Sequence, residues 1–297
     1  MKSRIYQFLF NEKGIALLMT ILIVTLLSIL IISIHSRSYL AIARAKNSVN
    51  SLKSYYIMRS GASAAMGFLE RDAKESNIDT FSENWAQGIR DFPVGDGIVS
   101  VAISDESSKF NINTMINSQG HPVEKAIVRF GKLLRELDID EGFSLTIAEW
   151  LKKNRKDFSY TFRDISELPL VSGFTPETLK KIEKHITVYT DRRNERNINI
   201  NTVGIEVLRS LSSELTETLT IAIMDYRKEH PFKEIADLKK VQGIDDVILS
   251  SFSDVIDVKS SVFTITSESK VSNTVKRGVA IVNRGMNTVK IAVWREE

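Results

Sequence analysis

The chain of 297 residues contains no cysteine, so a disulfide framework, a thiolate metal site and a cysteine nucleophile are all excluded. It also lacks a large net charge, because 40 basic residues balance 37 acidic ones and leave only +3. A polyanionic partner is therefore not indicated by the overall charge. Hydrophobic residues make up 43% and charged residues 26%, which is typical of a mostly globular chain.

Recognisable catalytic motifs are absent as well. The sequence has no G-x-S-x-G, no phosphate-binding glycine loop and no H-E-x-x-H. The histidines are scattered singly, and none shares a helix face with a second metal ligand: His35, His121, His185 and His230. We therefore predict that the protein is not an enzyme.

A long run without charge is present near the N-terminus. Residues 15–34 (IALLMTILIVTLLSILIISI) contain no charged side chain, and a helix of roughly 20 apolar residues spans a bilayer. A secretory signal peptide would have a shorter apolar region of about 7 to 15 residues, followed by small residues at a cleavage site. Here the run continues into further helical sequence, and no proline occurs before Arg71. The sequence predicts one membrane-spanning helix that extends to about Arg71.

The segment before this helix is short and basic. Residues 1–14 (MKSRIYQFLFNEKG) end in Lys13-Gly14 directly before the apolar run. Charge counting does not orient the helix, because three basic residues precede it and four follow it closely: Lys2, Arg4 and Lys13, then Arg37, Arg44, Lys46 and Lys53. The segment resembles the class III leader of type IV pilins and pseudopilins. That resemblance implies cleavage between Gly14 and Ile15 by a prepilin peptidase, N-methylation of Ile15, a cytoplasmic N-terminus and a body outside the membrane.

Strand patterns lie on both sides of a helical region. The period-two run 98–104 predicts one strand, and three more are expected at 262–268, 277–283 and 288–294. The last two are joined by a plausible hairpin turn at 284–287. Strands divided in this way predict an α+β fold, in which a long N-terminal helix packs on an antiparallel sheet and a large all-α domain is inserted between strands.

The inserted region contains a degenerate repeat. The run 110–114 (FNINT) recurs as 198–202 (ININT), and 145–148 (LTIA) recurs as 219–222. The run 162–173 (FRDISELPLVSG) recurs as 232–243 (FKEIADLKKVQG). Three blocks in the same order twice indicate two helical modules of the SAM-like or helix-hairpin-helix-like kind. We expect the Asn-x-Asn-Thr blocks to be helix starts, capped by Asn or Thr.

Taken together, these features resemble the protein K family of minor pseudopilins of type II secretion systems. Most pilin-like subunits carry Glu at the fifth mature position, whereas this chain has Met19, and the K-type subunit characteristically lacks that Glu. The resemblance implies five segments: leader 1–14, transmembrane helix 15–34, helix extension and first part of a pilin-like domain 35–110, inserted α-domain 111–258, and C-terminal strands 259–297. The assembly helix would include Ile15, Met19, Thr25 and Ser28.

The same resemblance implies a role and a location. The subunit would sit at the pseudopilus tip and start assembly with minor pseudopilins I and J, other pseudopilins and the inner-membrane assembly platform. It would span the bacterial inner membrane once, with its body in the periplasm, and serve protein export across the outer membrane.

No cofactor is expected. Proteins of the K family often carry an acidic Asp-Trp-x-Asp-type cluster that binds calcium. At the matching place this chain has Glu149-Trp150-Leu-Lys152-Lys153-Asn154-Arg155, where cations replace the acids. The family calcium site is therefore not carried over to this chain.

The alternative function is a membrane-anchored, competence-type DNA-binding protein. Residues 168–179 resemble a helix-hairpin-helix, whose turn can present backbone N–H groups to a phosphate. Against this, the helix that follows has mixed charge, and the second copy places Asp245 and Asp246 where a phosphate would lie. DNA binding favours a basic stripe, so no nucleic-acid partner is expected.

Overall fold

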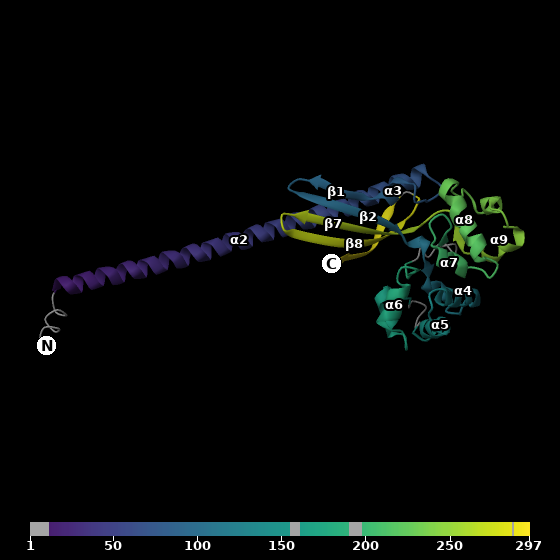
Figure 1. Ribbon diagram of the computed structural model, residues 1–297, viewed down its shortest axis with the longest axis horizontal. Coiled ribbons are helices and arrows are strands. Elements are labelled where there is room, and N and C mark those ends of the chain that lie inside the picture. Colours follow the sequence, from purple (N-terminus) through teal and green to yellow (C-terminus); the bar gives the residue numbers. More distant parts are fainter. Residues whose placement is uncertain (1–11, 155–160, 190–197, 287) are drawn as a thin grey trace.

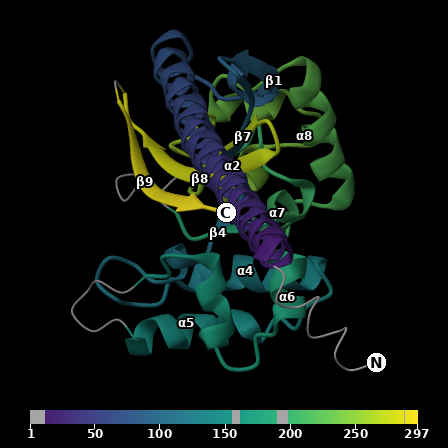
Figure 2. The same cartoon turned by 90° about the vertical axis from the view of Figure 1, so that its left-hand side faces the viewer.

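The computed structural model describes residues 12–154, 161–189, 198–286 and 288–297. One helix dominates its shape: α2 (Glu12–Glu75) extends as a rod from the body (Figure 1). Its C-terminal part lies against a sheet, as the view along the helix also shows (Figure 2). The predicted long helix on an antiparallel sheet is confirmed.

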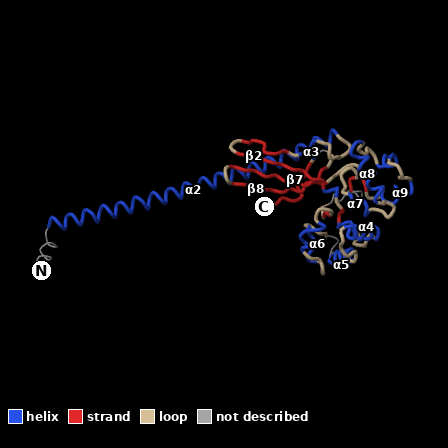
Figure 3. The backbone as a smooth tube through the Cα atoms, in the orientation of Figure 1, coloured by secondary structure: helices blue, strands red, loops and turns tan. Residues whose placement is uncertain are grey.

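The sheet has five antiparallel strands in the order β1-β2-β7-β8-β9. Their bounds are β1 Ile89–Val94, β2 Gly97–Asp105, β7 Val262–Val271, β8 Thr274–Arg284 and β9 Val289–Glu296. Strand β2 pairs with β7 along its whole length, so the chain leaves the sheet after β2 and returns to the neighbouring position at β7. The described residues between these two strands form a region beyond the end of the sheet (Figure 3).

Strand β1 was not predicted, since the first strand was expected only at Ile98. It contains Pro93 and pairs with β2 through an irregular register in which Asp91 has a φ of 48°. Proline is tolerated on an edge strand, where the missing N–H faces away from the sheet. The irregular register and the proline hide the alternation that reveals the other strands.

One face of α2 packs on the sheet through a stripe of buried side chains. Ser54, Met58, Ala62, Ala65 and Leu69 recur at helical spacing and are all buried. A Cβ on Gly61 would lie 2.7 Å from Ser267 Oγ and from Val99 Cγ2, so glycine permits the closest approach. Hydroxyl groups fasten the contact: Ser267 Oγ donates to the Met58 carbonyl at 2.8 Å, and Ser269 Oγ donates to the Ser54 carbonyl at 2.6 Å.

The region between β2 and β7 has its own hydrophobic core, whose largest side chains include Phe130, Phe162, Phe232 and Phe252. Short helix α3 (Asn84–Gln87) lies outside this region, beside β2. The region itself contains η1 Glu106–Ser108, β3 Phe110–Asn111, η2 Ile112–Met115, α4 Glu124–Glu136, α5 Phe143–Asn154, η4 Ile165–Leu170, α6 Pro176–Ile182 and β4 Ile186–Thr187. It continues with β5 Ile198–Asn199, α7 Ile205–Ser210, α8 Glu217–Glu229, η5 Ile235–Lys240, α9 Asp246–Phe252 and β6 Ile256–Asp257.

The repeated sequence blocks occupy equivalent places in two modules. Asn113 donates to the Phe162 carbonyl and accepts from the Phe162 N–H, both at 2.9 Å. Asn201 makes the same pair of bonds to Phe232, at 3.0 and 2.9 Å. In each module the first strand pairs in parallel with the last, β3 with β4 and β5 with β6.

The expectation that Asn of these blocks caps the following helix is confirmed in the first block, where Asn111 is the N-cap of η2 and its side chain accepts the Asn113 N–H at 3.0 Å. The α-helices that come later in each module are not capped in this way. The N-caps of α4 and α7 are Val123 and Gly204, and neither has a side-chain cap bond. Asn113 and Asn201, the second asparagines of the two blocks, bond to a distant backbone segment of their own module, a contact that sequence spacing does not reveal.

Candidate functional site

The N-terminal half of α2 carries the residues predicted for processing and assembly. It is long and apolar enough to cross a membrane, and none of its most apolar stretch is buried. Gly14 and Ile15 lie within the helix. Ile15 and Met19 are exposed by 44% and 57%, so the structure leaves both side chains available to lipid or to other chains.

The two polar residues of the predicted assembly helix satisfy their own hydrogen bonds. Thr25 Oγ1 donates to the Leu22 carbonyl at 2.8 Å, and Ser28 Oγ donates to the Val24 carbonyl at 2.7 Å. An unpaired hydroxyl group is costly in hydrocarbon, and these bonds avoid that cost. Both residues are therefore compatible with a helix surrounded by lipid or by neighbouring apolar helices.

A second polar site joins α2, the sheet and the helical region. Arg284, at the end of β8, is buried and donates to Asp72 at 2.7 Å and to the Ser260 carbonyl at 2.8 Å. It also pairs with Asp79, in the segment that follows α2. One guanidinium group thus holds the end of the long helix to the points where the chain returns to the sheet.

Asp105, at the end of β2, completes this junction. Its Oδ2 accepts from Ser260 Oγ at 2.6 Å and from Thr202 Oγ1 at 2.5 Å, and its Oδ1 accepts from the Ser107 N–H at 2.7 Å. Burial raises the pKa of Asp105 to about 6, although these hydrogen bonds oppose the shift. The second module is therefore bonded directly to the sheet through Thr202.

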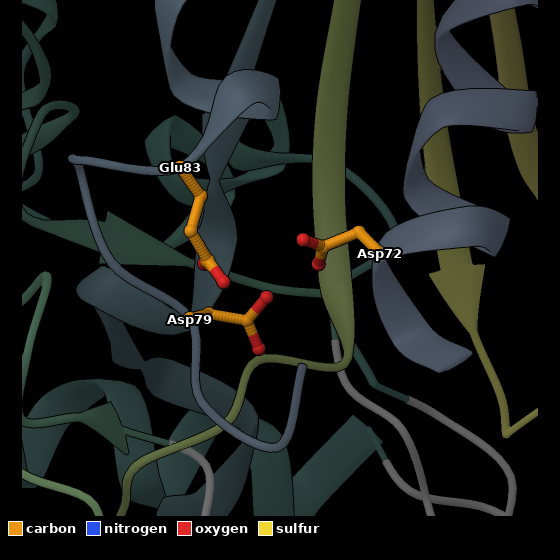
Figure 4. A group of neighbouring side chains, drawn as sticks. All are labelled: Asp72, Asp79 and Glu83. Atoms are coloured by element: carbon orange, nitrogen blue, oxygen red, sulfur yellow. The ribbon is translucent and has the colours of Figure 1, made fainter. Parts of the chain in front are cut away.

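Three carboxyl groups meet beside Arg284: Asp72, Asp79 and Glu83 (Figure 4). Burial, followed by repulsion from Glu83 and Asp79, raises the pKa of Asp72 to about 6. The pKa of Asp79 is also raised, chiefly by burial, even though Arg284 acts in the opposite direction. A single guanidinium group does not balance three acids in this space.

Reasoning from the sequence missed this junction. Asp72, Asp105, Ser260 and Arg284 lie far apart along the chain and belong to no common motif. Only the pairing of β2 with β7, and of β7 with β8, brings Asp105, Ser260 and Arg284 together at one end of the sheet.

The segment that matches the family calcium motif forms the end of α5. Trp150 stacks on Phe162 with a ring-centroid distance of 4.8 Å, so its indole ring packs in the first module. Lys152 and Lys153 lie in the last turn of α5, and Arg155 is outside the described residues. No cluster of three acids was found at this place among the described residues.

The second hairpin offers little unpaired positive charge. In the second module Lys239 pairs with Asp246, and Lys240 pairs with Asp237 at 2.5 Å. The Asp245 side chain accepts a hydrogen bond from the Ile248 N–H at the start of α9. This backbone N–H is therefore already occupied and is not available to donate to a phosphate. In the first module Thr175 accepts the Thr178 N–H in the same way.

Two family models match the chain. Residues 108–191 match "Type II secretion system (T2SS), protein K", and residues 193–256 match "Helix-hairpin-helix motif". The two matched ranges correspond to the first and second modules described above.

Several curated relatives bear the name type II secretion system protein K. The protein of Klebsiella pneumoniae is 26% identical over 239 residues, covering 71% of this chain and 72% of the relative. The protein of Aeromonas hydrophila is 22% identical, and the match covers 96% of this chain and 97% of the relative.

A solved structure has the same fold. A chain of the GspK–GspI–GspJ complex from the type 2 secretion system of enterotoxigenic Escherichia coli matches with a TM-score of 0.69 and 18% identity. The match covers 86% of this chain and 99% of the solved one.

Proposed function

Because the chain belongs to the type II secretion system protein K family, we propose that it is the minor pseudopilin at the tip of a type II secretion pseudopilus. There it starts filament assembly for protein export across the outer membrane. Proteins of this family are pseudopilins and not enzymes. The observation that carries the proposal is α2, whose first half is apolar and exposed while its second half packs on the sheet.

In this role the chain crosses the bacterial inner membrane once and has its body in the periplasm. Prepilin peptidase cuts between Gly14 and Ile15, and the new N-terminus of Ile15 is methylated. The unbroken apolar surface after Gly14 supports this, because the mature helix then begins directly with residues that suit the bilayer. Charge counts do not decide the orientation, so the leader segment carries that part of the proposal.

Met19 supports a place at the tip. In a pilin-like filament the acid at the fifth mature position can pair with the N-terminal amine of a neighbouring subunit. A thioether cannot make such a pair, and a subunit at the end of the filament has no neighbour above it that offers an amine. The broad helical region beyond the sheet also suits a cap better than a repeating layer.

The proposed partners are the minor pseudopilins I and J, together with other pseudopilins and the inner-membrane assembly platform. The solved complex supports I and J, since the chain that shares this fold was crystallised with GspI and GspJ. The exposed apolar half of α2 supports contact with other membrane helices, where side-chain packing rather than the hydrophobic effect stabilises association.

The test is purification of the full chain from detergent-solubilised membranes of its own host, followed by mass spectrometry. We expect a mature N-terminus at Ile15 carrying a methyl group, and co-purification of the I- and J-type subunits. Replacing Gly14 with valine should leave a longer, unprocessed chain, whereas Gly67→Val, in the exposed part of α2, should leave processing unchanged. A wild-type chain that begins at Met1 or beyond Ser33, without these partners, would contradict the proposal.

The helix-hairpin-helix match keeps DNA binding as the alternative function. We propose that the two modules have a structural role instead. The Asn113 and Asn201 bonds hold Phe162 and Phe232, and both phenylalanines belong to the hydrophobic core that the two modules share. The lysines of the second hairpin are paired with acids, which supports the same view.

A further inference from the structure

The carboxylates of Asp72, Asp79 and Glu83 have the spacing of a cation site. One oxygen from each residue lies within 4.8 Å of the others. A calcium ion binds oxygen ligands at about 2.3 to 2.6 Å, so one ion placed between the three residues can reach an oxygen of each. Figure 4 shows the Asp79 carboxyl group turned into the space between the other two side chains.

Asp79 adds an independent observation. Its side chain is completely buried, yet Oδ1 has no hydrogen-bond donor. Only one other buried side-chain oxygen among the described residues lacks a donor, Oε2 of Glu106. A buried, unpaired carboxylate oxygen is costly, and a bound ion is one of the few groups that removes the cost.

The other atoms around the cluster do not provide a donor for it. Arg284 and the Ser260 N–H both reach Asp79 through Oδ2. Glu83 Oε2 accepts from the Thr80 N–H at 2.8 Å and from Trp85 Nε1 at 3.0 Å. With three acids and one guanidinium group, the formal local charge is −2, which a divalent cation neutralises.

We propose that Asp72, Asp79 and Glu83 form a binding site for a divalent cation of the calcium type, at the end of α2. All its ligands are hard carboxylate oxygens, which favours calcium over softer metals. Asp72 and Glu83 are partly exposed, so solvent reaches the site and water can complete the coordination. The ion would fasten the segment after α2 to the helix end, beside the Arg284 junction. This site is separate from the Glu149–Asn154 segment, and it departs from the expectation that the chain binds no metal.

Trp85 allows a direct test, because its indole donates to a proposed ligand. Terbium(III) replaces calcium at oxygen sites and emits when a nearby tryptophan is excited. The full chain in detergent, stripped with chelator, should show terbium emission on tryptophan excitation that excess calcium abolishes. Trp85→Phe should lose the emission but keep a calcium-dependent rise of the unfolding temperature, since its ligands are unchanged.

Substitutions of the ligands complete the test. Glu83→Gln keeps an acceptor oxygen for Thr80 and Trp85 but removes the negative charge. Terbium should therefore bind to this variant at least tenfold more weakly than to wild type. Asp72→Asn should weaken terbium binding to a similar extent. Asp96→Asn is the matched control. Asp96 is an exposed acid in the turn between β1 and β2, away from the proposed site, and it pairs with Lys53 of α2. If wild type gives neither emission nor a calcium-dependent thermal shift, or if both ligand variants match wild type, the site does not exist.

Discussion

At the scale of single residues, Asp105 makes the stability of the body depend on pH. Burial raises its pKa to about 6, from an ordinary value of 3.8. The folded chain therefore holds this proton more tightly than the unfolded chain. The contribution of Asp105 to the free energy of unfolding is largest below pH 4, declines as pH rises through about 6, and is constant above that.

Replacing Asp105 with asparagine should remove this decline. A shift of about two pKa units corresponds to about 3 kcal/mol, so the unfolding free energy of Asp105→Asn should rise by roughly that amount relative to wild type between pH 4 and pH 7. Denaturant unfolding of both full chains, followed by tryptophan fluorescence across this range, measures the difference. A constant difference would show that Asp105 has the same pKa in the folded and unfolded chains.

At the scale of elements, contact between α2 and the sheet depends on the absence of a side chain at Gly61. Gly67 lies on the exposed side of the same helix, and a Cβ there would meet nothing within 4 Å. Leucine favours helix by up to about 1 kcal/mol over glycine at either position. Substitution by leucine therefore brings the same gain in helix propensity at both positions, and only the packing around the new side chain differs.

Gly61→Leu should destabilise the body by about 1 to 3 kcal/mol, because the new side chain overlaps Ser267 and Val99. Gly67→Leu should be neutral or slightly stabilising. Thermal unfolding of the two variants gives the comparison. Equal stabilities would mean that α2 and the sheet are not in close contact at Gly61.

At the scale of the whole molecule, the charge pattern predicts negligible binding to duplex DNA at physiological salt. Each DNA phosphate that a protein neutralises adds about −0.9 to the slope of log affinity against log salt concentration, so a true site is readily recognised. The full chain should show no such slope in fluorescence anisotropy. Asp245→Asn combined with Asp246→Asn removes the acids of the second hairpin and should increase binding only modestly. Micromolar, steeply salt-dependent binding by wild type would favour the competence-type alternative.

The sequence by itself determined the long apolar helix, four of the five strands of the sheet, and the duplication of the helical module. Each of these leaves a local signal: an uncharged run, alternation with period two, or blocks repeated in order. Sequence alone also pointed to the family, through Met19 and the layout of strands around the helical region.

Only the tertiary structure decided how distant polar residues meet. The asparagine bonds of the two modules, Asp105 with Thr202, and Arg284 with its acids all join positions that no local pattern connects. Edge strand β1 escaped prediction for a related reason, since a proline and an irregular register erase its alternation. The local periodicity of a sequence indicates which face of a helix or strand is buried. The partner of a buried charged side chain depends instead on which strands pair, because strand pairing decides which strand ends lie next to each other.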